Sequence, residues 1–447
     1  MVNGNTAGTT VVKVNNIFGK GEATTNGVQI IEVSGNSNGV FSLNEPVQAG
    51  SWEYILNKKG NSWFLESSYY PDGKTKDYSF GKPFNTTPNK PDSTSSSVGN
   101  PGSKSGQIPR IYRPGVSAYV VAQNLNNEIL SLSAGSLQSR LGEQYNSQVA
   151  ACLPGSENDS ALFAKNLAWG RYSISSLKLS GLNQFELESD ISLLQLGTDL
   201  SRVINPQDLS RRQIGVFVNL GASESDAGNR ARDLAKLAVT TGEINTRQIG
   251  VGTYLTHYTK NGEYINWVGQ VNQISSDYTD IYQGRSQQKS YSVGTSLDWG
   301  KPQKLGQSKW LFEPQAQAQY HLSSHSGFKD SVSNIDSYFS HSAKIRLGGR
   351  LSWNSTPELP SSEKDSIKQN TFYTTVSVAK EILSNSAVNI GGTKVLDELS
   401  DSPWLEVGLG GQIPIFENAY IFGQIQAQKN LGGSKRSALS SHFGFRY

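Results

Sequence analysis

The sequence predicts an all-β protein whose C-terminal part closes into an antiparallel transmembrane barrel of about twelve strands. Apolar and polar residues alternate with a period of two, most clearly in the run from Trp310 to Leu322. Aromatic residues lie near both ends of the apolar face of this run, and small residues lie in its middle, which is typical of a lipid-facing strand. The pattern repeats to the last residue, Tyr447. The alternative is an amphipathic strand of a soluble β-sandwich.

The composition agrees with a barrel. The 447 residues include 45 Gly, 19 Tyr and 8 Trp, and the mean hydropathy is -0.45. Such a chain is polar on average because half of each strand faces water. No stretch approaches the roughly 20 apolar residues of a membrane helix, so spanning a bilayer would require a closed barrel. The net charge of +3 indicates no nucleic-acid partner, and the single cysteine, Cys152, excludes an intrachain disulfide.

Residues 1–80 are predicted to form a small β-solenoid. Short apolar clusters separated by Gly and Asn turns recur at similar intervals from Val11 to Leu43. A hairpin follows whose aromatic side chains are expected to cap the end of the stack: Trp52, Tyr54, Trp63 and Phe64. A small all-β module of another role is the alternative.

A linker and a helix are expected next. Residues 81–111 are rich in Pro, Ser, Gly, Asn and Lys, which cannot bury a core, and are predicted to be flexible. Residues 112–160 begin with apolar residues at helical spacing, which predicts a helix over 114–141 that stops at Gly142. This helix either packs outside a sheet or threads the lumen of a barrel. The candidate lumen-helix residues are Val116, Val121, Leu125, Asn126, Asn127 and Ile129.

Residues 161–447 are predicted to form the barrel. The expected strands are 161–174, 185–200, 212–223, 244–258, 263–276, 287–300, 308–323, 339–354, 369–383, 403–414, 418–430 and 437–447. Their polar faces suit a water-filled interior, and the candidate lumen-wall residues are Glu313, Gln315, Gln317, Arg346, Arg350 and Glu406. Long connections at 224–243, 324–338 and 384–402 alternate with tighter ones, as in barrels with short turns at one end. The connection at 355–368 is longer than this rule predicts.

Four segments, in order along the chain, resemble type V autotransporters of the pertactin and adhesin group. S-W-E-Y-I-L-N-K-K-G-N-S-W-F-L-E-S at 51–67 resembles the end of a pertactin-like passenger. Y-R-P-G-V-S-A-Y at 112–119, with R-L-G-E at 140–143, resembles the helix that enters the translocator barrel. L-L-Q-L-G-T-D-L at 193–200 and F-E-P-Q-A-Q-A-Q-Y at 312–320 resemble two barrel strands. Two departures are Gly115, where the family usually has an acidic residue, and His442, where its terminal signal usually has Gly.

The resemblance implies an outer-membrane translocator that secretes its own N-terminal passenger and anchors it at the cell surface. Residues 1–80 would be the passenger end with an autochaperone role, and the C-terminal insertion signal would be Phe443, Phe445 and Tyr447. The implied partners are outer-membrane lipid, the barrel assembly machinery, periplasmic chaperones and a host surface ligand of the passenger. The barrel is expected to be monomeric and virulence-associated. Because the first residues carry no basic n-region or apolar h-region, a signal peptide is expected upstream.

No catalytic, cofactor or metal site is expected, and the chain is not expected to be an enzyme. The five histidines show no metal-ligand spacing. Asn126–Asn127 resembles the site at which some autotransporters cut themselves, with Glu313 and Glu406 as candidate assisting acids. Three hypotheses therefore stand: a translocator module, a surface adhesin for which the barrel is only an anchor, and a self-cleaving barrel.

Overall fold

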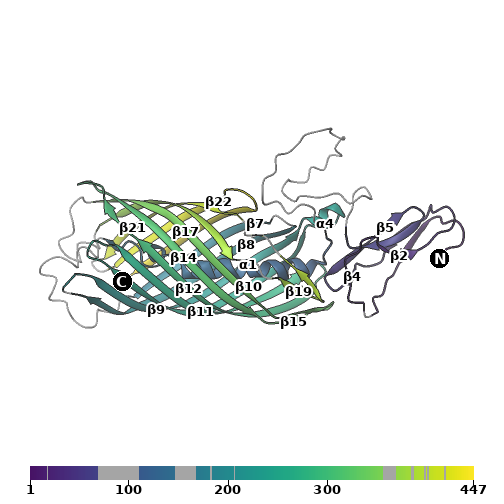
Figure 1. Cartoon of the computed structure of the whole chain (residues 1–447), viewed down its shortest axis with the longest axis horizontal. Helices are drawn as coiled ribbons and strands as arrows, with labels where there is room; N and C mark the ends of the chain where they lie inside the picture. Colours follow the sequence, from purple (N-terminus) through teal and green to yellow (C-terminus); the bar gives the residue numbers. More distant parts are fainter. Residues whose placement is uncertain are drawn as a thin grey trace, which may run out of the picture.

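The computed structural model shows a barrel of tilted strands, a helix along its axis and an elongated β-module beyond one end (Figure 1). It describes residues 1–17, 19–68, 110–145, 168–181, 184–205, 207–355, 369–383, 387–396, 399, 402–416 and 419–447. The expected strand start at 161–167, most of the linker, and Cys152 lie outside these residues. Within the described ranges, no helix has both the length and the apolar character needed to cross a membrane.

Twelve long strands build the barrel wall, as the sequence predicts. They are β7 (Ala168–Ser180), β8 (Phe185–Ile204), β9 (Arg211–Asn229), β10 (Thr240–Tyr258), β11 (Tyr264–Asp280), β12 (Arg285–Gly300), β14 (Trp310–His325), β17 (Tyr338–Asn354), β18 (Thr371–Leu383), β21 (Trp404–Phe416), β22 (Ala419–Asn430) and β23 (Lys435–Arg446). Each strand pairs antiparallel with its neighbours in this order, and β23 pairs with β7, which closes the barrel.

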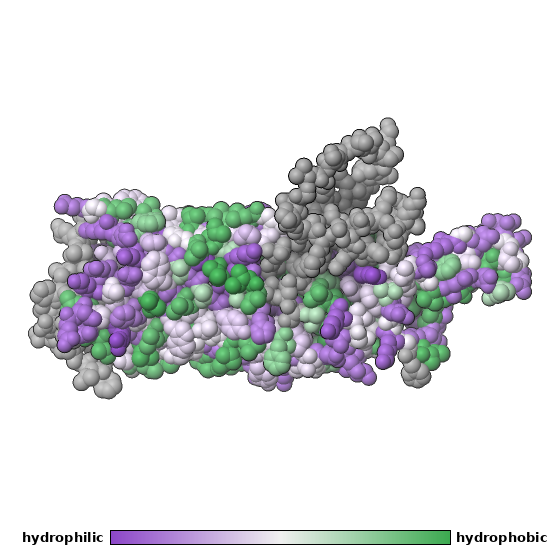
Figure 2. All heavy atoms as spheres, viewed as in Figure 1, coloured by the Kyte–Doolittle hydropathy of each residue, from purple (hydrophilic) through white to green (hydrophobic). Residues whose placement is uncertain are grey.

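The period-two pattern separates a lipid face from a lumen face. On β14, Trp310 and Phe312 are 44% and 43% exposed, whereas Glu313 and His321 are 1% and 2% exposed. In Figure 2, hydrophobic residues gather on the barrel wall, and hydrophilic residues dominate the module beyond it. The outward phase is therefore the one that meets lipid, which confirms the membrane reading of the alternation.

The long connections gather at the barrel end that faces the β-module. There β15 (Phe328–Lys329), β16 (Asn334–Ile335), β19 (Val388–Ile390) and β20 (Thr393–Val395) form a four-stranded sheet, and α4 (Ala231–Leu234) lies between β9 and β10. The opposite end carries tighter turns such as 259–263, the short strand β13 (Gln303–Lys304) and the C-terminus. We call the barrel end that faces the β-module the mouth.

Among the described residues, two helices thread the lumen in place of the single helix that the sequence predicts. α1 (Pro114–Ala134) starts at the mouth and is buried along nearly its whole length, so the lumen placement is confirmed. The expectation of one helix to Gly142 is wrong, because Gly135 turns to φ 56° and ends α1. Ser136 then caps α2 (Leu137–Leu141) by accepting a hydrogen bond from the Ser139 amide. Gly135 has φ 56° and ψ -173°, a conformation that is strained for residues with a side chain, so the break requires glycine.

The N-terminal module consists of β1 (Thr9–Val12), β2 (Val28–Ile31), β3 (Val40–Leu43), β4 (Val47–Ala49), β5 (Trp52–Lys59) and β6 (Ser62–Glu66). β1 pairs parallel with β3, with Thr9 opposite Val40. The parallel bridges Val2–Val33 and Thr6–Ser37 have the same residue offset. A constant offset between parallel segments is what a solenoid coil requires. The solenoid itself stays a prediction, since the described residues contain one such stacked step.

Removing residues 112–141 is expected to open the barrel without unfolding it. The strands pair with one another and not with the helices, so the deleted form refolded in detergent should still migrate faster before boiling than after it. Because the deleted helices fill the lumen, its conductance in a planar bilayer should rise several-fold. If neither form shifts on boiling, the chain does not form a detergent-resistant barrel. If both conduct alike, the helices do not plug it.

Candidate functional site

The lumen is the candidate functional site, because the barrel wall encloses it and α1 runs along it. All six candidate lumen-helix residues are at most 5% exposed. Val116, Leu125 and Ile129 belong to one apolar cluster with residues of the wall. The half of the lumen near the mouth is therefore sealed by apolar packing.

This apolar half of the lumen was missed by the sequence reasoning, which expected polar walls. Its wall side chains include Leu177, Leu187, Ile191, Ile244 and Tyr278, and all are buried. Leu187 and Ile191 occupy the inward phase of β8, so apolar residues in the lumen phase are the signal that could have revealed it. These contacts exclude water where the helix passes the mouth.

The other half of the lumen holds the helices through hydrogen-bonded charges. Glu313 receives hydrogen bonds at 2.8 Å from Gln138 Nε2 of α2, at 3.0 Å from the Tyr264 hydroxyl and at 2.8 Å from Gln315 Nε2. Arg350 Nη2 lies 2.7 Å from its second carboxylate oxygen. A buried carboxylate is tolerated only with such full pairing. Glu313 and Arg350 therefore clamp α2 rather than line an open channel.

The remaining wall candidates are partly in contact with the helices. Gln317 Nε2 donates to the Gly135 carbonyl at 2.6 Å, which satisfies the backbone at the helix break. Arg346 Nη1 lies 4.0 Å from Glu406 Oε2, and Glu406 also accepts from Trp404 Nε1 at 2.8 Å. These residues therefore form a paired polar wall.

Glu128 and Arg436 form a helix-to-wall contact that the sequence reasoning missed. Both Glu128 oxygens pair with Arg436, at 2.7 and 2.8 Å, and the guanidinium lies over the Trp404 ring at 4.3 Å. Arg171 is a second missed residue, since its Nη2 donates to the Leu132 carbonyl at 2.9 Å near the end of α1. Isolated charges in the helix and strand patterns do not reveal which strand meets which helical turn.

The Asn126–Asn127 pair lies inside the lumen, in the middle of α1. Asn127 Nδ2 donates to Glu381 Oε1 at 3.3 Å, and Ser342 donates to the same oxygen at 2.7 Å. The Asn126 side chain is 1% exposed, and its amide has no hydrogen-bond partner among the described residues. The two candidate acids contact other groups: Glu313 pairs with Arg350, and Glu406 accepts a hydrogen bond from Trp404. Glu381, which was not a candidate, is the carboxylate that contacts the pair.

A buried ion pair locks the β-module to the mouth. Arg232 Nη1 of α4 lies 2.9 Å from Glu53 Oε2, and the two side chains are 1% and 3% exposed. The Tyr282 hydroxyl of the β11–β12 turn donates to Glu53 Oε1 at 2.9 Å. Burial and the Glu53 carboxylate raise the pKa of Tyr282 to about 12, so the phenol remains a donor. Arg232 Nη1 also donates to the Tyr112 carbonyl at 3.0 Å.

A second ion pair fixes the chain just before α1. Arg113 Nη2 lies 2.7 Å from Asp330 Oδ2, with side chains 2% and 4% exposed, and Arg113 Nε donates to the Gly50 carbonyl at 2.6 Å. The Ser51 hydroxyl donates to the Ile390 carbonyl of the mouth sheet at 2.7 Å. Gly115 stands where the family usually has an acidic residue. Glycine suits the packing here, because a Cβ at this position would lie 2.9 Å from the Tyr119 hydroxyl.

Of the proposed cap residues, Trp52 and Tyr54 lie at the mouth end of β5, whereas Trp63 and Phe64 lie toward the tip of the β5–β6 hairpin. Trp52, Tyr54 and Trp63 are buried and Phe64 is partly buried. Trp52 stacks on Tyr112 with ring centroids 4.9 Å apart, and Tyr112 stacks on Phe185 of β8 at 5.8 Å. Burial raises the pKa of Tyr112. This aromatic stack joins the end of the module to the barrel wall.

The C-terminal aromatic residues lie on the lipid face of the closing strand. Phe443, Phe445 and Tyr447 are 57%, 46% and 63% exposed. The Tyr447 amide donates to the Ala168 carbonyl at 2.9 Å, and Arg446 Nη2 lies 2.6 Å from Asp199 in the lumen. His442, the second departure from the family pattern, is half-buried and pairs with Ser173 across the seam. The last residues therefore belong to the seam between β23 and β7.

Metal ligation finds no support in the described part of the chain. No three His, Cys, Asp or Glu residues there are grouped so that they could hold a metal ion.

Fold and site together define a twelve-stranded membrane barrel, plugged by the segment that leads into it and joined at its mouth to a β-module. The sequence-family model of the autotransporter beta-domain matches residues 168–426. The family model of the type 1 autochaperone domain matches residues 1–56. The chain belongs to the autotransporter family. Its barrel is an outer-membrane translocator domain, which confirms the resemblance and the location inferred from the sequence.

Similar proteins include one that is named as an autotransporter. The chain is 28% identical to the uncharacterized protein YdeU of Escherichia coli K12, covering 100% of this chain and 91% of that protein. It is 26% identical to the adhesin BmaC autotransporter of Brucella suis over 78% of this chain, and it spans 10% of the length of that adhesin.

Two solved structures have the same fold. The transport unit of the autotransporter AIDA-I from Escherichia coli superposes with a TM-score of 0.54 at 14% identity, covering 75% of this chain and 99% of that structure. The translocator domain of NalP from Neisseria meningitidis gives a TM-score of 0.50 at 10% identity, covering 74% and 99%.

Replacing Glu53 with Gln is expected to release the β-module from the mouth. The variant leaves the buried Arg232 charge unpaired, which costs about 3–5 kcal/mol. Hydrogen exchange should speed up at the amides of residues 50–53, and a protease should remove residues 1–68 faster. Glu45→Gln is the matched control, because the Glu45–Lys13 pair is exposed on both sides and contributes about 0–1 kcal/mol. Equal protection in both variants would mean that the ion pair does not hold the module.

Proposed function

We propose that the barrel secretes the segment N-terminal to it and then anchors that segment at the cell surface. The observation that carries the proposal is the path of the chain, which runs from the β-module through the mouth and along the lumen as α1. A chain left in this position has its N-terminal part on one side of the membrane and its C-terminus on the other. The clustering of long connections at the mouth supports the cell-surface side for the module.

Folding of the β-module at the mouth is proposed to drive the last stage of export. The module docks through the Glu53–Arg232 and Arg113–Asp330 pairs, which exist only once residues 50–53 are outside. Each buried pair opposes backward movement of the chain, because withdrawal would separate its two charges. In this mechanism residues 1–68 are an autochaperone, and no nucleotide or metal takes part.

Assembly of the barrel is proposed to depend on factors outside this chain. Phe443, Phe445 and Tyr447 would be read by the barrel assembly machinery, and periplasmic chaperones would keep the unfolded strands apart. The support is their place on the lipid face of the closing strand. We further infer that the unit acts by position and folding, not by catalysis, and that one chain makes a complete barrel.

The autochaperone role can be tested by deletion. Without residues 1–68, an unrelated passenger fused to residue 69 should reach the surface but remain sensitive to an added protease. With residues 1–68 present, the same passenger should be resistant. Heat-modifiability of the barrel serves as the control and should be equal in both. A protease-resistant passenger on the deleted form would contradict the role, while loss of surface exposure in both forms would contradict the translocator function.

A surface adhesin is the second candidate function. Two relatives are named as adhesins, BmaC and the AIDA-I adhesin, and the latter is 38% identical over 17% of this chain. In that case the module and the loops at the mouth would contribute to binding a host surface ligand, and the barrel would serve only as anchor.

Self-cleavage at Asn126–Asn127 is the third. The contact between Asn127 and Glu381 is the observation in its favour. In the main proposal the chain stays intact, so a single band of full length is expected after isolation of outer membranes. Asn126→Ala and Asn127→Ala should leave that band unchanged. A shorter band in the parent protein, abolished by either substitution, would establish cleavage.

A further inference from the structure

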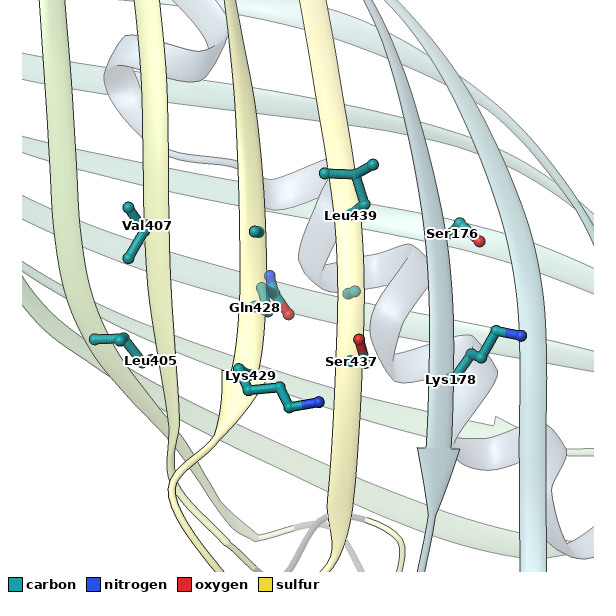
Figure 3. Close-up of a pocket in the computed structure, with 10 residues that line it drawn as sticks. Ser176, Lys178, Leu405, Val407, Gln428, Lys429, Ser437 and Leu439 are labelled. Atoms are coloured by element: carbon teal, nitrogen blue, oxygen red, sulfur yellow. The ribbon is translucent and has the colours of Figure 1, made fainter.

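A shallow groove lies on the outer wall of the barrel, toward the mouth (Figure 3). It crosses four neighbouring strands, β21, β22, β23 and β7, and so includes the β23–β7 seam that closes the barrel. Lysine, serine and aliphatic side chains line it together. On a surface that faces lipid, this combination calls for an explanation, because lysine ammonium groups are costly in hydrocarbon.

One cross-strand row of the groove carries its polar groups. Lys429 pairs with Ser437, and Ser437 pairs with Lys178 on the next strand. Neighbouring strands lie about 4.8 Å apart, so the two lysine backbones stand about 10 Å apart with the serine hydroxyl between them. All three side chains are on the exposed, outward phase. Two ammonium groups and a hydroxyl on one surface can donate together to the oxygens of a phosphate.

The next row of residues, farther from the mouth, is mainly apolar and alternates large side chains with small ones. Val407 pairs with Ala427, Ala427 with Leu439, and Leu439 with Ser176. Val407 and Leu439 are 41% and 59% exposed, while Ala427 and Ser176 are too small to fill the space between them. The row beyond this one continues with Leu409 and Ile425, which are 66% and 61% exposed. The groove therefore passes from cations to hydrocarbon surface in the direction of the bilayer centre.

The charge of this face differs from that of the adjacent face, which begins at β8 beside β7. At the mouth ends of β8, β9 and β10 the outward side chains are mostly acidic, with Arg247 as a cation among them: Glu188, Asp190, Glu224, Asp226 and Glu243. Lys178 does pair with Glu188, but their side chains are 64% and 56% exposed, so a stronger anion can replace that contact. Lys435 adds a third outward lysine one step toward the mouth.

We propose that this groove binds a phosphorylated lipid of the outer leaflet. The phosphate would contact Lys178, Ser437 and Lys429, and an acyl chain would lie against Leu439 and Val407. The apolar row faces the bilayer, which favours a lipid over a water-soluble partner, and the lysines select an anionic headgroup. Because the lipid spans β22, β23 and β7, it would also hold the closing seam together. The inference rests on the outer-membrane location and on the proposed placement of the mouth at the cell surface, and not on the secretion mechanism.

The test uses the full chain refolded in a neutral detergent, with diphosphorylated lipid A as the probe. The parent protein should bind the lipid, and Lys178→Ser with Lys429→Ser should weaken binding about 25-fold, since each lysine near an anionic surface contributes a factor of about five. Replacing both with Arg should retain most of the affinity. Lys289→Ser is the matched control, because Lys289 is an outward lysine near the mouth end of β12 on another face. Heat-modifiability confirms folding of every variant.

Two further measurements separate the contribution of the headgroup to binding from that of the acyl chain. Leu439→Asn should weaken lipid A binding, and inorganic pyrophosphate should bind far more weakly than the lipid. Equal lipid affinity in the parent and the double serine variant would overturn the proposal. Pyrophosphate binding as tight as that of lipid A would show a free-phosphate site instead, and loss of affinity in Lys289→Ser as well would show a general charge effect.

Discussion

The structure depends on one constraint: within a bilayer, every backbone amide and carbonyl must find its partner inside the protein. A sheet satisfies this only when it has no free edge, and the pairing of β23 with β7 removes the last one. The final residues contribute to that seam directly, because the Tyr447 amide bonds to the carbonyl of Ala168. The chain must therefore be complete to its last strand before the wall can exist. This gives a physical reason for lipid-facing aromatic residues at the C-terminus.

Closure creates a second requirement, since the lumen it encloses must be filled or wet. This chain fills the lumen with α1 and α2, and it does so in two different ways. Near the mouth, Val116, Leu125 and Ile129 pack on apolar wall residues, which keeps water out. Farther in, the buried charges Glu313 and Arg350 meet each other and Gln138 of α2. Such pairs give position more than stability, because desolvation offsets much of the attraction between the charges.

The mouth combines both kinds of contact with the folded β-module. Glu53 is held by Arg232 and Tyr282 from two different connections, and Trp52 and Tyr112 form an aromatic stack beside them. A module that folds here is bound to the barrel by groups that are exposed to water before docking. The same contacts that fasten the module also close the lumen behind it, which links anchoring to sealing.

The sequence by itself determined the strands, because a period of two with an apolar outward phase has few other solutions. All twelve were predictable, and so was a helix before them, whereas its place inside the lumen was left open. The sequence reasoning missed the break at Gly135, although a glycine that follows a helical run is itself a stop signal. It also missed Glu128, Arg436, Glu53 and Arg232. The strand pattern tells which face a charge occupies, but the register between strands and the height of the helix in the lumen decide which charge it meets. Those two quantities exist only in the closed barrel.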